Sequence, residues 1–133
     1  MSAIRDALLA NVTTNTSSTT IGVSSELPWA QGDTPLYEKN MKKFYLSEES
    51  SATTQLFATI DRNDVFQKER SLTGFITVDA KNQPNDIDTV VAAVINSRLA
   101  IADQSVNECA VAVDTEEDRI TYTFEYRFVT ITN

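Results

Sequence analysis

Four carboxylates lie close together near the end of the chain, at Asp114, Glu116, Glu117 and Asp118. Carboxylate oxygens are the ligands that hard divalent cations such as Ca²⁺ take in proteins. This run has neither the glycine nor the spaced ligands of a calcium-binding loop, and acids between two strands more often form a solvated turn. We therefore predict an acidic loop without a metal over residues 114–118, with a cation site as the alternative.

The other residues offer little for catalysis. The sequence contains no histidine, which is the commonest general base and metal ligand. Its single cysteine, Cys109, lies in the apolar run 109–113, where we expect a small buried thiol and not a nucleophile. Its three glycines, Gly22, Gly32 and Gly74, are too scattered for a phosphate-binding loop. The sequence thus predicts neither an enzyme nor a cofactor.

Two aromatic residues, Trp29 and Tyr37, are candidates for a binding surface. They lie in residues 26–41, an expected extended loop that holds the only tryptophan and two of the three prolines. Trp and Tyr are frequent at the centres of protein interfaces. We predict that both side chains contact a neighbouring subunit or another protein. The alternative is that Trp29 packs beneath the loop as a satellite of the core.

The charge of the chain limits its partners. The sequence has 19 acidic and 11 basic residues, for a net charge of −8, so it has no general electrostatic attraction for nucleic acid. No apolar run is long enough to cross a bilayer, and the first residues lack the pattern of a secretory signal. We expect no membrane partner and a chain that stays in the cytosol where it is made.

A long strand at the end of the chain should organise the fold. Over residues 119–132, polar residues alternate with an apolar series, namely Ile120, Tyr122, Phe124, Tyr126 and Phe128. This period of two is typical of a β-strand with one buried face. The strand should span about 45 Å and cross the whole domain. We expect Phe124 and Tyr126 to face the core beneath a helix.

That helix is predicted at residues 85–100, capped by Asn85, and a second amphipathic helix at residues 2–12. Strands are predicted at 42–46, 56–60, 65–79 and 109–113, with a turn at 61–64. Residues 13–20 should form a polar linker or lead into an edge strand through Ile21 and Val23. Gly74 inside a strand indicates close approach of another backbone or a large side chain, and an aromatic of the last strand is the candidate.

This order of elements predicts an α+β fold. We expect residues 1–133 to form a single domain, with a mostly antiparallel sheet and two helices packed on one face. Hairpin-linked strands interrupted by two helices favour this arrangement over a parallel sheet, because parallel strands need a crossover between each pair.

The chain also resembles a known family, the tail-terminator proteins of long-tailed, non-contractile bacteriophages, of the lambda minor tail protein U type. The shared features are the opening helix, the strands and hairpin of residues 42–79, the single helix at 85–100 and the closing pair of long strands. Three short segments are similar to those of such phage tail proteins: residues 27–29 (LPW), 34–37 (TPLY) and 79–82 (DAKN).

The resemblance implies a structural protein of the virion tail, assembled in the host cytoplasm. Proteins of that family form a hexameric ring that caps the tail tube, ends tube polymerisation and offers the surface for head attachment. The implied partners are other copies of the chain, the tail tube protein and the head-tail connector protein. DNA would only pass through the lumen, where we expect the acidic loop 114–118 to face the channel or one of its rims.

Two other classes of function stay open. A small α+β ligand-binding module, or less readily an enzyme, would need a concave pocket between helix and sheet. A partner-binding, inhibitor-like module would bury one patch, around Trp29, on a foreign protein. The oligomeric state separates the three classes, because only a ring subunit is expected to form hexamers.

Overall fold

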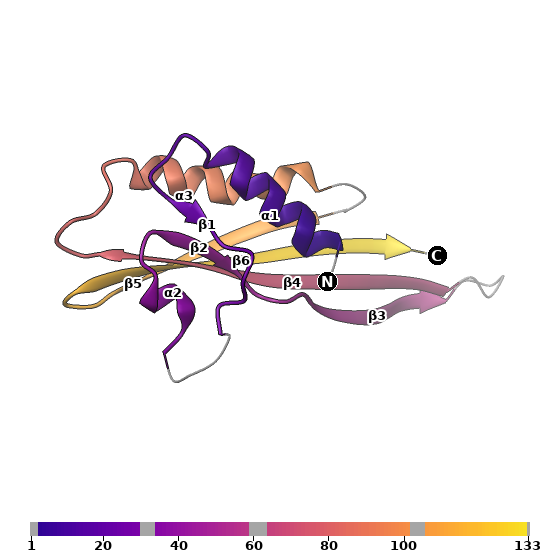
Figure 1. The fold of residues 1–133 in the computed structure, drawn as a ribbon. Coiled ribbons are helices and arrows are strands. Elements are labelled where there is room, and N and C mark those ends of the chain that lie inside the picture. Colours follow the sequence, from indigo (N-terminus) through magenta and orange to yellow (C-terminus); the bar gives the residue numbers. More distant parts are fainter. Residues whose placement is uncertain (1–2, 30–33, 59–63, 102–105, 133) are drawn as a thin grey trace.

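The computed structural model describes residues 3–29, 34–58, 64–101 and 106–132. They form one six-stranded, mostly antiparallel sheet (Figure 1). Helix α1 (Ala3–Asn15) and helix α3 (Ile87–Asn96), which the 3-10 turn η1 (Ser97–Ala100) continues, cover one face of this sheet. The predicted α+β class and the placement of the two helices are confirmed. A short helix that the sequence did not predict, α2 (Leu36–Lys39), lies on the opposite face, called here the outer face.

The centre of the sheet is a long antiparallel pair. Strand β4 (Asp64–Asp79) pairs with β6 (Arg119–Thr132) from Phe66 opposite Thr132 to Asp79 opposite Arg119. Strand β5 (Val106–Thr115) continues the sheet beyond β6. On the other side, β2 (Lys43–Leu46) and β3 (Ser50–Ala58) share the edge of β4, and β1 (Gly22–Val23) runs parallel to β2.

A polar break separates β2 from β3 without interrupting the hydrogen bonding to β4. The Ser47 amide donates to the Thr73 carbonyl at 2.9 Å, and the Thr73 amide donates to Ser47 Oγ at 2.9 Å. The Ser47 hydroxyl thus accepts the hydrogen bond that a backbone carbonyl would accept in a continuous strand. Strand β3 begins at Ser50, earlier than the predicted residue 56, because its Ser and Thr residues pair with β4 in spite of their loop-like composition. Most of the predicted turn at 61–64 lies outside the described residues.

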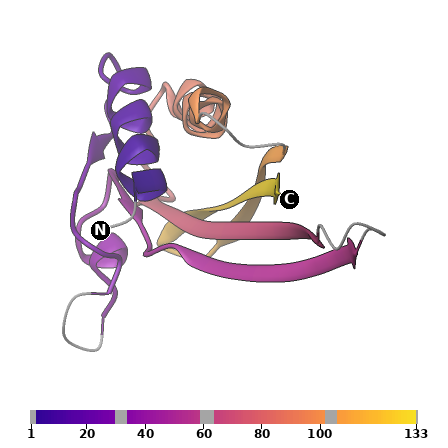
Figure 2. The same cartoon turned by 90° about the vertical axis from the view of Figure 1, so that its right-hand side faces the viewer.

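In both views the hairpin of β3 and β4 extends away from the helices (Figures 1 and 2). The first half of β4 pairs there with β3 on one side and with the end of β6 on the other. This three-stranded extension is called here the tongue. Helices α1 and α3 cover the other end of the sheet, so the hydrophobic core lies at that end.

The core follows the predicted alternation of the last strand. Phe124, Tyr126 and Phe128 are buried against α3, and the Tyr126 hydroxyl donates to the Val94 carbonyl at 2.8 Å. Val90 contributes a second fully buried side chain from the same helix face. The expected burial of Phe124 and Tyr126 beneath the helix is therefore confirmed.

Gly74 leaves room for an aromatic ring, but the ring comes from a different strand than predicted. A Cβ atom on Gly74 would lie 2.5 Å from Cε2 and 2.6 Å from Cζ of Phe44, which belongs to β2. Phe124 of the last strand contacts that ring edge to face, with centroids 6.2 Å apart. The prediction of close approach was right. The prediction that the ring comes from the last strand was wrong, because β2 pairs with β4 at this point.

Two helix boundaries differ from the sequence prediction. Helix α1 continues to Asn15, because the hydroxyls of Thr13 and Thr16 donate to carbonyls four residues back, at 2.8 and 2.7 Å, and so fit a helical segment. Helix α3 begins at Ile87, and Asn85 does not cap it. The N-cap residue is Asp86, whose carboxylate accepts hydrogen bonds from the amide and hydroxyl of Thr20.

Candidate functional site

The two aromatic residues predicted to form a contact lie together on the outer face. Tyr37, in α2, stacks on Phe75 of β4 with ring centroids 4.3 Å apart and an interplanar angle of 8°. Trp29 stands edge to face against both rings, at 5.6 Å from Tyr37 and 5.3 Å from Phe75. These three rings are called here the aromatic cluster. Phe75 was missed as a site residue, although it is an apolar residue between Thr73 and Thr77 on the largely polar face of its strand.

The two predicted contact residues differ in exposure. Trp29 is 56% exposed, whereas Tyr37 is only 9% exposed. Burial, and then the charge of Glu38, raise the pKa of the Tyr37 phenol. Tyr37 therefore acts as a support, and Trp29 presents the accessible surface. The predicted loop is also shorter than 26–41, because α2 occupies part of it and the Leu36 amide donates to the Pro28 carbonyl at 2.7 Å.

A hollow of about 270 Å³ opens beside Trp29. Leu27, Pro28 and Trp29 form one wall, and Ser47 and Glu48 form the other. The Glu48 side chain is exposed, and among the residues described its carboxylate has no hydrogen bond or ion pair. This feature, called here the Trp29 hollow, thus combines an aromatic face, apolar carbons and a free negative charge.

A buried arginine holds the segments that form the hollow. Arg5 of α1 is 2% exposed, and its guanidinium donates to three backbone carbonyls. The acceptors are Ser25 at 3.1 Å, Leu46 at 2.9 Å and Ser47 at 3.1 Å. Ser25 precedes one wall of the hollow and Ser47 belongs to the other, so Arg5 links both walls to the helix behind them. No pattern in the sequence indicated this role for Arg5.

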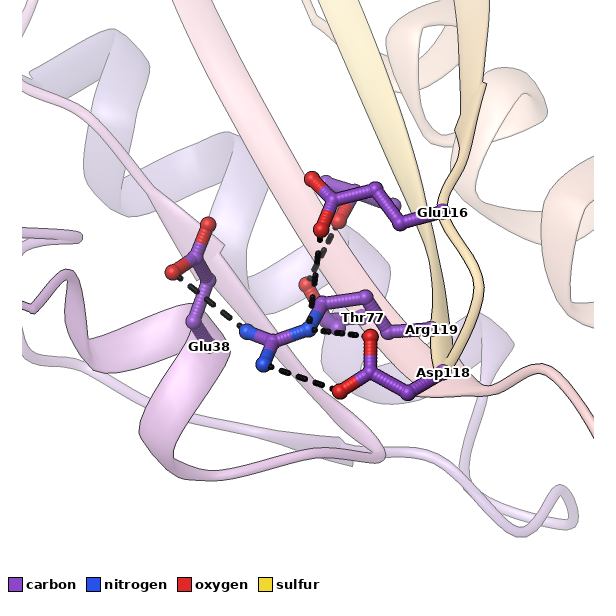
Figure 3. A network of polar contacts seen from close by, with 6 residues as sticks. Glu38, Thr77, Glu116, Asp118 and Arg119 are labelled. Carbon is purple, nitrogen blue, oxygen red and sulfur yellow. Dashed lines mark hydrogen bonds and ion pairs between the residues drawn. The ribbon is translucent and has the colours of Figure 1, made fainter.

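The four predicted acidic residues do not lie in one loop. Asp114 belongs to β5, and the turn consists of residues 116–118. Arg119 lies among the carboxylates of Glu116, Asp118 and Glu38, at 4.0, 3.3 and 3.5 Å (Figure 3). Hydrogen bonding to Arg119 lowers the pKa of the Asp118 carboxyl. A cation from the chain itself therefore balances part of the charge, and no group of side chains suited to a metal ion occurs in the described ranges.

A second hollow, of about 310 Å³, lies on the outer face over β4, β6 and β5. Its floor holds small side chains such as Ser71, Thr73 and Ala110. Arg127 crosses it, donating to Glu69 at 2.7 Å and to Glu108 at 3.3 Å. These ion pairs join neighbouring strands at the surface. The hollow lies on the face opposite the helices, not between helix and sheet where a ligand-binding module was expected to have its pocket.

Cys109 is not poised for nucleophilic chemistry. The side chain lies half-buried on the helix-facing side of β5, and burial raises the pKa of its thiol to about 11. Near neutral pH the thiolate is therefore scarce, in agreement with the expected inert thiol. Among the helices described, none has the length and apolar character needed to span a membrane.

The two long edges of the sheet are candidates for contact with another chain. Within the part of the chain that is described, no strand pairs with the outer side of β3 or of β5. Neither strand contains lysine or proline, the residues that commonly protect an edge, and β3 has no charged residue at all. These edges lie on opposite sides of the same sheet.

No protein-family model matches this sequence, and no curated protein matches it.

Proposed function

We propose that the protein is a structural subunit that closes a phage tail tube as a ring. In this role it ends tube polymerisation and forms the surface to which the head-tail connector attaches. The observation that carries the proposal is the pair of long, unprotected edges, β3 and β5, on opposite sides of one sheet. Such edges present rows of amide and carbonyl groups that pair readily with another strand.

A contact between two different edges of identical subunits is heterologous. Repeated contacts of this kind close into a ring when the rotation between neighbours fits a full turn. In the proposed hexamer, β3 of each copy pairs with β5 of the next, and no long edge remains free. The twist that strands impose on a sheet supplies the rotation between subunits.

The charge of the chain agrees with a ring that DNA crosses. A net charge of −8 on each copy makes a wall that repels phosphate groups, so DNA passes without binding. We place the acidic turn at the lumen or a rim. Because Arg119 balances part of its charge, the repulsion between copies is smaller than four free carboxylates would give.

Edge pairing is tested by lysine substitutions. Thr54→Lys in β3 and Ala112→Lys in β5 each place a charged side chain on an edge and should shift the assembly to monomers in native mass spectrometry. Ala92→Lys, at an exposed position of α3, is the matched control and should assemble like the parent. Assembly of both edge variants at the parental concentration would exclude this interface.

The biological role is tested in the genome that encodes the protein. A stop codon in this gene should produce tubes of uncontrolled length and heads without attached tails, visible by electron microscopy. Particles of normal tail length, joined to their heads, would refute the proposed function. Complementation with the Ala92→Lys variant, but not with the edge variants, should restore normal particles.

The proposed position of the acidic turn predicts a salt effect on assembly. Replacing the three acids of the turn, Glu116, Glu117 and Asp118, and the nearby Asp114 of β5 with the matching amides should ease ring formation at low ionic strength, where charges are screened only beyond about 30 Å. Ring formation by the parent and by the amide variant should differ less at high salt. An unchanged salt dependence, followed by light scattering, would place the turn away from the ring axis.

A partner-binding module is the second candidate function. The exposed Trp29 beside a concave surface favours it, because a fixed exposed aromatic is a common anchor in protein interfaces. Such a module would form a complex of defined stoichiometry with a foreign protein and would not form hexamers. Light scattering of the purified chain and of its complexes separates the two.

A further inference from the structure

We propose that the Trp29 hollow binds an arginine side chain of a partner protein. The alkyl stem and guanidinium would lie along the indole of Trp29, and the guanidinium would pair with the carboxylate of Glu48. This inference concerns the isolated chain and does not depend on ring formation. Failure of arginine binding would not contradict the proposed ring, and failure of ring formation would not contradict arginine binding.

The first step is that Trp29 is exposed and yet held in one orientation. Its indole contacts Tyr37 and Phe75 edge to face, while more than half of its surface is open to solvent. Edge-to-face contacts of this kind favour a defined ring geometry. An aromatic side chain that is already ordered loses little conformational entropy on binding, which favours affinity.

The second step is that both walls of the hollow are fixed from behind. The buried guanidinium of Arg5 binds the carbonyls of Ser25 and Ser47, one associated with each wall. The Pro28 carbonyl accepts a further hydrogen bond from the first amide of α2. The hollow is therefore built by contacts between segments distant in sequence, and not by a single loop.

The third step concerns the chemistry of the ligand. A cation above an indole face is attracted by the negative face of the ring, and arginine is the residue most often found there. Leu27 and Pro28 add apolar surface for an alkyl stem, and the unpaired Glu48 carboxylate lies on the opposite wall. An apolar ligand would leave Glu48 without a partner, and an acidic one would be repelled by it and by the net charge of −8.

A second copy of the chain is a poor source of this arginine. Within the described ranges, every arginine is already engaged with groups of its own chain: Arg5, Arg70, Arg98, Arg119 and Arg127. Releasing one of them would break an existing contact. Arg62 is the one further arginine, and it lies outside the described residues. We take the partner to be a different protein that presents an arginine on its surface.

The single tryptophan makes the inference directly measurable, because the indole N–H gives one side-chain resonance that belongs to Trp29. The probe is the capped tripeptide Gly-Arg-Gly, titrated at low salt, and its match carries citrulline, which has nearly the same shape and no charge. The arginine peptide should shift the indole resonance saturably, with Kd in the millimolar range. The Kd of the citrulline peptide should be at least about fivefold higher than that of the arginine peptide.

Variants assign the effect to the hollow. Glu48→Gln should weaken binding of the arginine peptide about fivefold, whereas Asp88→Asn, the same charge change on α3 at the other face of the sheet, should leave Kd unchanged. Both positions are exposed, so both variants should keep the parental unfolding temperature. The proposal is overturned if the indole resonance does not respond up to about 50 mM peptide, well above a millimolar Kd. It is also overturned if the citrulline peptide binds the parent protein with the same Kd as the arginine peptide. The same holds if Glu48→Gln binds the arginine peptide with the Kd of the parent protein.

Discussion

A methyl group on Gly74 would overlap the ring of Phe44, because its Cβ would lie 2.5 and 2.6 Å from two ring carbons. The ring is fully buried and packs against Phe124, so it cannot move aside freely. Overpacking of a core typically costs about 1 to 3 kcal/mol. Replacing a strand glycine with alanine recovers about 0.4 to 1 kcal/mol by restricting the unfolded chain. We expect Gly74→Ala to lower the free energy of unfolding by about 1 to 2 kcal/mol.

Thermal unfolding followed by circular dichroism measures this effect. For a chain of this size the midpoint should fall by about 4 to 7 °C. Gly22→Ala is the matched control, since its Cβ would meet the nearest atom, Cγ of Lys43, at an ordinary 3.6 Å. That variant should unfold within about 2 °C of the parent or slightly above it.

A double-mutant cycle identifies the Phe44 ring as the cause. Phe44→Leu alone should destabilise the protein, because it leaves a cavity, but the smaller side chain should accept the new methyl group. The double variant should therefore be more stable than the sum of the two single effects by about 1 kcal/mol. Additive effects, or a Gly74→Ala variant as stable as the parent, would refute the proposed packing of β2 on β4.

Three further outcomes are expected. Phe124→Ala should cost about 3 to 5 kcal/mol in urea unfolding, as large core truncations do, and a midpoint near that of the parent would contradict its burial. Arg5→Met should cost about 2 to 4 kcal/mol, because buried carbonyls lose their donors, and should broaden the Trp29 indole resonance; a sharp, unshifted resonance would show that Arg5 does not order the hollow. At pH 8 iodoacetamide should alkylate Cys109 on the order of 200 times more slowly than in the urea-unfolded chain, since its pKa is about 11 and only the thiolate reacts, with a tenfold rise per pH unit up to that pKa; equal rates would show an accessible thiol.

Periodicity along the chain was sufficient to predict the class of the fold and which face of its last strand is buried. Alternation over residues 120–128 specifies which side chains share a face, and helical spacing does the same for α3. Both patterns are local, so they need no knowledge of distant segments. Both predictions were confirmed, because side chains alternate between the two faces of any strand and recur about every 3.6 residues on one face of any helix.

Local composition was less informative where polar side chains bond to nearby backbone. Thr13 and Thr16 lie in a segment that resembles a linker, yet their hydroxyls return to helix carbonyls. Strand β3 begins in a run of Ser and Thr that is typical of loops, because β4 offers it a pairing partner. In these segments propensity alone did not decide the structure. Hydrogen bonds within one helical turn decided it at the end of α1, and pairing with β4 decided it in β3.

The candidate site depends on contacts that form only when distant segments of the folded chain meet. The sequence indicated that Trp29 and Tyr37 suit an interface, but not that Phe75 joins them or that Arg5 orders the hollow. Each of these contacts joins segments far apart along the chain. A periodic pattern states which face of an element is buried, and it carries no information on which distant element covers that face. The pairing of β2 with β4 is therefore what brings the aromatic cluster together, and no local signal specifies that pairing.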